Sequence, residues 1–231
     1  MTKTMTLSGL ILSWMSASVL AMGEADPLLS QVIVDQLEIR DAVHHRPWVL
    51  EAQGWIGYDL HKLRWKADLE WADAELEEAV MQVLYSRAAD PYWDWQVGWQ
   101  YQNRPRPERH ALVLGVQGLA PYWLETDAAL LLGKQGLVSV QARVEHEVML
   151  TQRWVLIPEL GMQWQRRVAP EMGSGFDLFL GARLAYEIRR EFAPYVGLIW
   201  QRQFAGSADV MHQTGAAVSA TQWVAGVKFW F

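Results

Sequence analysis

Apolar and polar residues alternate with a period of two through most of the chain. In the segment 63–71 the apolar positions carry Leu63, Trp65, Ala67, Leu69 and Trp71. The positions between them carry Arg64, Lys66, Asp68 and Glu70. Because successive side chains of a strand point to opposite faces, this pattern predicts β-strands with one apolar and one polar face. The same pattern recurs in 93–101, 137–150 and 176–189.

Twelve such strands are predicted. Their approximate bounds are 31–40, 48–57, 62–73, 76–86, 93–102, 109–118, 122–132, 137–149, 153–165, 175–189, 192–204 and 219–231. Many reach the ~9–11 residues that a tilted strand needs to cross a bilayer, whereas soluble strands average about five or six. Connections after the second, fourth, sixth, eighth and tenth strands are short, and those after the first, fifth, ninth and eleventh are longer. Short periplasmic turns and longer external loops produce this asymmetry in bacterial barrels, although the third and seventh connections are also short.

These features favour an all-β fold, a closed antiparallel transmembrane β-barrel of about 12 strands. In hydrocarbon every backbone N–H and C=O needs an internal partner, which strands obtain only by closing the sheet. The 14 Trp residues suit the interfaces of such a barrel. The alternative is a periplasmic β-sandwich with a dry core. Pro158 lies inside the ninth predicted strand and counts against a regular ladder there.

The N-terminal residues 1–23 read as a secretory signal peptide. Lys3 supplies the positive charge, the run from Leu7 to Leu20 is apolar, and Ala21-Met22-Gly23 offers a cleavage site. We therefore expect a short spacer at 24–30 and an outer-membrane barrel at 31–231.

The final strand has an apolar or aromatic residue at every second position. These are Trp223, Ala225, Val227, Phe229 and the C-terminal Phe231. Such an ending resembles the signal read by the machinery that inserts outer-membrane barrels. Periodicity alone predicts only an amphipathic strand.

Composition removes several classes of function. The formal charge of −6 and a pI near 5.5 give no reason to expect a nucleic-acid partner. The absence of cysteine excludes disulfides and thiolate metal sites. No Ser-His-acid arrangement stands out, since Ser139 and His146 fall on opposite strand faces, so we expect no enzyme and no catalytic residues.

Six short strings carry a family resemblance. They are Asp90-Pro-Tyr-Trp-Asp-Trp, Gly115-Val-Gln-Gly-Leu-Ala-Pro-Tyr-Trp, Leu150-Thr-Gln-Arg, Gly173-Ser-Gly, Tyr186-Glu-Ile-Arg-Arg-Glu-Phe-Ala-Pro-Tyr-Val-Gly and the Phe-Trp-Phe ending. With them the chain resembles the copper resistance protein B family over roughly 31–231. The resemblance implies an outer-membrane protein of bacterial copper tolerance that binds or sequesters copper ions. The expected partners are outer-membrane lipid and copper ions, and a periplasmic copper-handling protein is a further candidate partner.

The chain departs from that family in its spacer. Many members carry a long Met-, His- and Asp-rich segment between signal peptide and barrel, whereas residues 24–30 here contain neither Met nor His. Any copper site must then be built by the barrel and its loops.

Ligand chemistry narrows the candidates for copper. Cu(I) prefers thioethers and Cu(II) suits imidazole, so Met and His are the side chains to consider. Met81, Met162 and His146 share apolar strand faces, and we interpret those methionines as lipid-facing or packing residues. Met172 falls in the fifth external loop. His44 and His45 lie in the first predicted external loop, and Met211 and His212 lie in the last. Because the first and last strands of a closed barrel are neighbours, these four could converge at one rim and hold a copper ion loosely.

Charged residues occupy the polar faces. They are Arg64, Lys66, Asp68, Glu70, Asp94, Glu125, Asp127, Arg143, Glu145, Glu147, Asp177, Arg183, Glu187 and Arg189. We expect them to pair across the lumen and plug it, since unpaired charges in a narrow barrel are costly. A cation-conducting path is the alternative, because a twelve-stranded barrel is intermediate in width. The alternative function is a general outer-membrane channel with no specific metal role.

Overall fold

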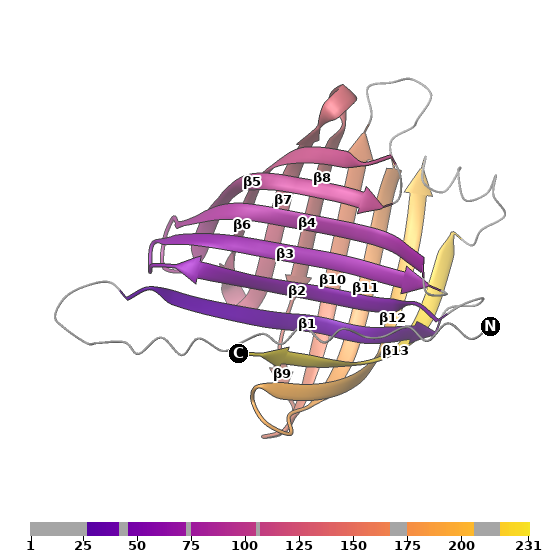
Figure 1. Ribbon diagram of the computed structural model, residues 1–231. Helices are drawn as coiled ribbons and strands as arrows, with labels where there is room; N and C mark the ends of the chain where they lie inside the picture. The colour runs from indigo at the N-terminus through magenta and orange to yellow at the C-terminus, as the bar shows by residue number, and fades with distance from the viewer. Residues whose placement is uncertain (1–26, 42–45, 73–74, 105–106, 167–174, 206–217) are drawn as a thin grey trace, which may run out of the picture.

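The alternating segments form antiparallel strands of one continuous sheet (Figure 1). This computed structural model describes residues 27–41, 46–72, 75–104, 107–166, 175–205 and 218–231. The elements are β1 (Leu29–Asp41), β2 (Trp48–Gly57), β3 (His61–Ala72), β4 (Glu75–Ala88), β5 (Trp93–Arg104), β6 (Arg109–Ala120), η1 (Pro121–Trp123), β7 (Leu124–Gly133), η2 (Lys134–Gly136), β8 (Val138–Glu145), β9 (Val148–Met149), β10 (Trp154–Arg166), β11 (Gly175–Tyr186), β12 (Phe192–Ala205) and β13 (Ser219–Trp230). Among these residues no helix is long and apolar enough to cross a bilayer.

The sheet closes on itself because β1 pairs with β13. Their antiparallel register runs from Ile33 opposite Trp230 to Asp41 opposite Trp223. Every other strand pairs with its neighbours in the chain, and β8 and β9 both pair with β10 in one register, so together they fill one position in the ring. The structure is therefore a closed 12-strand antiparallel barrel, which confirms the predicted fold class and excludes the sandwich. Its first strand begins at Leu29, two residues earlier than predicted.

The outward face of the barrel is apolar. Large exposed hydrophobic side chains on it include Leu63, Trp65, Met81, Val83, Tyr85, Trp95, Val97, Trp99, Leu160, Met162, Leu180, Val196 and Trp223. Buried polar side chains on the opposite, lumenal face include Gln36, Glu38, Arg40, Ser86, Gln96, Ser139, Glu159 and Arg183. This polarity is the reverse of a soluble protein and matches a wall between lipid and a polar lumen.

The two rims of the barrel differ. At one rim, here called the turn rim, the strands are joined by residues 58–60, 89–92, 121–123, 150–153 and 187–191, and the chain ends there at Phe231. The opposite rim, here called the loop rim, carries the connections after β1, β3, β5, β7, β10 and β12. Tyr92, Tyr122 and Trp123 are strongly exposed at the turn rim, where interfacial aromatic rings belong. Tyr122 and Trp123 both adopt positive φ angles, so η1 replaces the predicted start of the strand at 122.

Pro158 interrupts the ladder, as its residue type predicted. The strand predicted over 137–149 is divided into β8 and β9, and the break at residues 146 and 147 lies beside Pro158. The amide of His146 donates to the Pro158 carbonyl at 3.1 Å, but Pro158 has no N–H to return the bond. The register is nevertheless the same on both sides of the break, because Glu145 opposes Glu159 and Val148 opposes Leu156.

A β-bulge in β1 turns two consecutive polar residues toward the lumen. The register with β2 shifts between Val34 and Gln36, and the register with β13 shifts between Val34 and Leu37. Asp35 accepts a 2.6 Å hydrogen bond from Gln53, while Gln36 accepts one of 2.9 Å from Arg183. An extra residue of this kind bends the strand and redirects its side chains.

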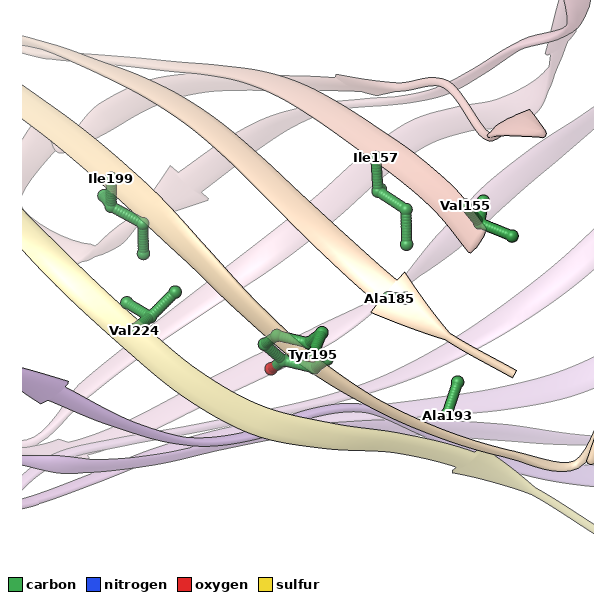
Figure 2. Packing of buried hydrophobic residues seen from close by; sticks show 7 residues of the cluster. All are labelled: Val155, Ile157, Ala185, Ala193, Tyr195, Ile199 and Val224. Atoms are coloured by element: carbon green, nitrogen blue, oxygen red, sulfur yellow. The ribbon is translucent and has the colours of Figure 1, made fainter. Parts of the chain in front are cut away.

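One stretch of the lumenal wall is packed as a small core. Side chains from β10, β11, β12 and β13 gather on the same side of these strands, as Figure 2 shows. They are Val155, Ile157, Ala185, Ala193, Tyr195, Ile199 and Val224. A second cluster of Leu84, Ala111, Val113 and Leu131 lines the wall of β4, β6 and β7. Parts of the lumenal wall are thus covered by closely packed apolar side chains.

Arg183 is the centre of a buried ionic network beside the first of these clusters. Its guanidinium pairs with Glu38 on β1 at 3.1 Å and also with Glu159 on β10. Tyr195 donates a 2.9 Å hydrogen bond to Glu38, and Arg40 pairs with the same carboxylate at 2.8 Å. Side-chain exposure is 4% for Arg183 and 0% for both glutamates, so these charges depend on each other for compensation.

Gly226 on β13 leaves room for this network. A Cβ at that position would lie 2.7 Å from the Glu38 Cβ and 2.8 Å from the Tyr195 hydroxyl. Only glycine therefore lets β1 and β12 bring these two side chains together across β13.

Removing the central cation should destabilise the barrel. We expect Arg183→Met, which keeps most of the side-chain length, to lower the free energy of unfolding by about 3–5 kcal/mol, because Glu38 and Glu159 remain buried without a counter-charge. Urea titration of protein refolded in detergent measures this. Arg202→Met, at an exposed position of β12, is the matched control. Equal stability of the two variants would contradict the role given to Arg183.

Restoring a backbone donor should rejoin the broken strand. We expect Pro158→Val to allow a second hydrogen bond to residue 146 and to raise the free energy of unfolding by about 0.5–1.5 kcal/mol. Slower amide exchange at residues 146–148 is the direct readout. Leu160→Val, at an outward position of the same strand, controls for the new side chain, and unchanged exchange in Pro158→Val refutes the explanation.

Candidate metal-binding rim and charged lumen

The four predicted copper ligands, His44, His45, Met211 and His212, lie outside the described residues, as does Met172. The strands that carry their loops are described. β1 ends at Asp41 and β13 begins at Ser219, and these two strands are hydrogen-bonded neighbours. Asp41 is directly opposite Trp223 in that pair. The connection after β1 and the connection before β13 therefore start from adjacent strands of the loop rim.

The described methionines and histidines are dispersed. Met81 and Met162 are exposed on the outward face, which confirms that they point away from the lumen. His61 contacts the Tyr85 hydroxyl at 2.5 Å, and the His146 ring contacts the Trp123 carbonyl oxygen at 3.1 Å. The His110 ring lies against Trp99 and Tyr101, with centroid distances of 5.6 and 5.0 Å.

No group of three or more metal-binding His, Asp or Glu side chains occurs within the described part of the chain. The histidines there have aromatic or carbonyl partners on or near the outward face. They do not form an alternative to the predicted rim site.

Ionic contacts cross the lumen between distant strands. Arg143 on β8 pairs with Glu51 on β2 at 2.6 Å, and these strands lie on opposite sides of the twelve-membered ring. Its Nε atom is also 3.2 Å from Glu159 on β10. Lys66 on β3 pairs with Asp127 on β7. The prediction that lumenal charges pair across the barrel is confirmed for these residues.

A second group of contacts links nearer strands. Arg64 on β3 is 3.3 Å from Asp94 on β5 and donates a 3.1 Å hydrogen bond to Gln117 on β6. Near the turn rim, Lys228 on β13 is 2.9 Å from Glu147 and 3.8 Å from Glu145. The lumen is therefore crossed by side chains at several heights.

Strand register also places carboxylates directly opposite one another. Glu145 on β8 faces Glu125 on β7 and Glu159 on β10. On the other wall, Glu51 opposes Asp68, and Glu70 opposes Glu78. Like charges in directly opposed positions destabilise a sheet unless cations lie between them. Arg143 lies between the two walls and contacts both Glu51 and Glu159.

Five of the charged residues that form these contacts were not predicted from the sequence. They are Glu38, Arg40, Glu51, Glu159 and Lys228. Each falls on a polar position of its strand, so the period of two could have found them. The bulge at Asp35 and Gln36 obscured the phase of β1, and Pro158 obscured that of β10.

Two expected lumenal charges are placed elsewhere. β11 ends at Tyr186, so Glu187 and Arg189 lie in the connection to β12 rather than on a lumenal strand face. The strand was predicted too long because the alternation continues into residues that have to reverse the direction of the chain before Phe192.

Solved structures of similar fold are porins. The NanC porin matches 87% of this chain and 99% of its own, with a TM-score of 0.56 and 12% sequence identity. The KdgM porin matches 88% of this chain and 99% of its own, with a TM-score of 0.53 and 12% identity. At this identity the likeness concerns the fold alone, and it agrees with a closed barrel.

Proteins found by sequence comparison share a higher sequence identity with this chain. Copper resistance protein B of Escherichia coli is 32% identical over 203 residues, which are 87% of this chain and 69% of the relative. A copper resistance protein B homolog of Pseudomonas syringae pv. tomato is 29% identical over 205 residues, 87% of this chain and 70% of the relative. The family model described as copper resistance protein B precursor (CopB) matches residues 28–231. The chain therefore belongs to the copper resistance protein B family.

Proposed function

We propose that this protein is an outer-membrane barrel that binds or sequesters copper ions in bacterial copper resistance, in a non-enzymatic role. The observation that carries the proposal is membership of the copper resistance protein B family over residues 28–231. The apolar outward face supports placement in a membrane, with lipid as its main contact.

The loop rim is the proposed external side and the turn rim the periplasmic side. In bacterial barrels the short turns are periplasmic and the longer loops external. The turns described here include residues 58–60 and 121–123, and the longest connection follows β12. A periplasmic copper-handling protein would then approach the turn rim.

The proposed copper ligands are His44, His45, Met211 and His212. Their side-chain types suit both common oxidation states of copper, because thioethers favour Cu(I) and imidazoles favour Cu(II). The pairing of β1 with β13 supports their proximity, since it attaches the two loops to neighbouring strands. We propose that copper is held loosely by these four residues.

Copper titration tests the site. We expect replacement of His44, His45, Met211 and His212 by Ala to weaken copper binding by the refolded full chain at least about tenfold, because each lost ligand bond removes on the order of 1 kcal/mol or more. The titration should be run with Cu(II) and, under reducing conditions, with Cu(I). Met81→Ala, Met162→Ala and His61→Ala, combined in one variant, remove the same ligand types from outward positions and should leave the affinity unchanged.

Two outcomes separate the parts of this proposal. Unchanged binding in the four-residue variant would refute the rim site while leaving a copper-binding barrel. Absence of copper binding by the unmodified protein, with unchanged copper sensitivity of cells that lack it, would refute the copper role and favour a general channel.

A further inference from the structure

The lumen of this barrel carries more acidic than basic groups. Carboxylates at lumen-facing positions of the described strands and of the break between β8 and β9 are Asp35, Glu38, Glu51, Asp68, Glu70, Glu78, Asp94, Glu125, Asp127, Glu145, Glu147, Glu159 and Asp177. Basic groups at such positions are Arg40, Lys62, Arg64, Lys66, Arg104, Arg109, Arg143, Arg183 and Lys228. A low-dielectric wall lined by an excess of one sign of charge concentrates counter-ions of the other sign.

Two arginines in this lumen have very different surroundings. The Arg183 side chain is 4% exposed and lies beside the aliphatic cluster of β10 to β13. The Arg143 side chain is 48% exposed although it contacts both Glu51 and Glu159. Water-sized space therefore reaches Arg143 inside the ring of strands. Arg183 belongs to the packed wall, whereas Arg143 borders open space inside the ring of strands.

Arg143 also makes a contact across the lumen. It extends from β8 and meets Glu51 on β2, the strand six positions away in the ring. A side chain that joins opposite walls narrows the space between them, and its positive charge lies between the directly opposed acidic pairs of the two walls.

We propose that the lumen conducts small hydrated cations in preference to anions, and that Arg143 sets the width and the electrostatic barrier of its constriction. This inference rests on the barrel and its charges and does not depend on copper binding at the loop rim. Lys66 and Asp127 also join distant strands, but their side chains are less exposed than that of Arg143. Their two charges neutralise each other, so this pair has no net charge.

The substitution Arg143→Gln separates this proposal from a purely structural role. It removes a cation from the passage, shortens the bridge to Glu51 and leaves the acidic pairs in place. We expect single-channel conductance in planar bilayers to rise roughly twofold or more, because the potential in the lumen becomes more negative by on the order of kT/e. In a KCl gradient the reversal potential of the unmodified protein should have the sign of a cation-selective pore, and that of the variant should move further toward the potassium limit.

The control is Arg87→Gln. Arg87 is exposed on the outward face of β4, next to the buried lumenal Ser86, so this variant makes the same charge change outside the passage. It should have the conductance and reversal potential of the unmodified protein. A general effect of net charge would instead appear in both variants.

A folding control keeps the test decisive. Circular dichroism and urea titration identify the folded fraction of each variant before reconstitution, and Arg143→Lys retains the charge if the glutamine variant does not fold. With a shorter reach to Glu51 and the same charge, the lysine variant should increase conductance and change the reversal potential less than glutamine does. Anion selectivity of the unmodified protein, or identical conductance and selectivity in folded Arg143 variants, would overturn the proposal.

Discussion

Closure of the sheet is the constraint on which the other features depend. In hydrocarbon an unpaired backbone N–H or C=O costs several kcal/mol, so a strand edge exposed to lipid is not tolerated. The seam between β1 and β13 removes both edges, and it continues beyond β13 because Phe231 and Val32 exchange backbone hydrogen bonds of 2.9 and 3.0 Å. The last residue of the chain is thereby part of the wall. Once the wall is closed, the period of two assigns each side chain to lipid or to the lumen.

The ionic network beside the seam adds specificity to that closure. Glu38 on β1 reaches Arg183 on β11 and Tyr195 on β12, and it passes Gly226 on β13 to do so. A slip of β1 by one residue would turn Glu38 toward lipid and leave Arg183 with one carboxylate fewer. Buried ion pairs contribute little net stability compared with apolar packing, but breaking one is costly. The network therefore penalises the wrong register more than it strengthens the right one.

Much of this fold could be predicted because lipid imposes a simple pattern. The strands, the outward position of Met81 and the disturbance at Pro158 all follow from local sequence. The partners within the lumen could not be predicted in the same way. Arg143 and Glu51 are 92 residues apart, and their contact depends on which strands lie opposite each other in the closed ring. The shift in the inward–outward alternation of β1 could not be predicted either, because no glycine or proline marks the bulge at Asp35. The sequence predicted that the four rim ligands lie near one another, and the pairing of β1 with β13 supports this. The positions of the ligands themselves remain a proposal.

The proposed ligands at the loop rim are Met and His, whereas the lumen carries carboxylates. This difference in ligand type distinguishes the proposed retention of copper from the proposed passage of other cations. Thioether and imidazole groups bind copper strongly, whereas carboxylates prefer hard cations and hold them through water. The described lumen supplies many carboxylates, but its described residues form no cluster of three metal-binding side chains. In the proposed conducting lumen, cations would act as exchangeable counter-ions to the acidic walls. If both proposals hold, the soft ligands of the loop rim would retain copper, and the Arg143 bridge would govern ion flow without determining copper affinity.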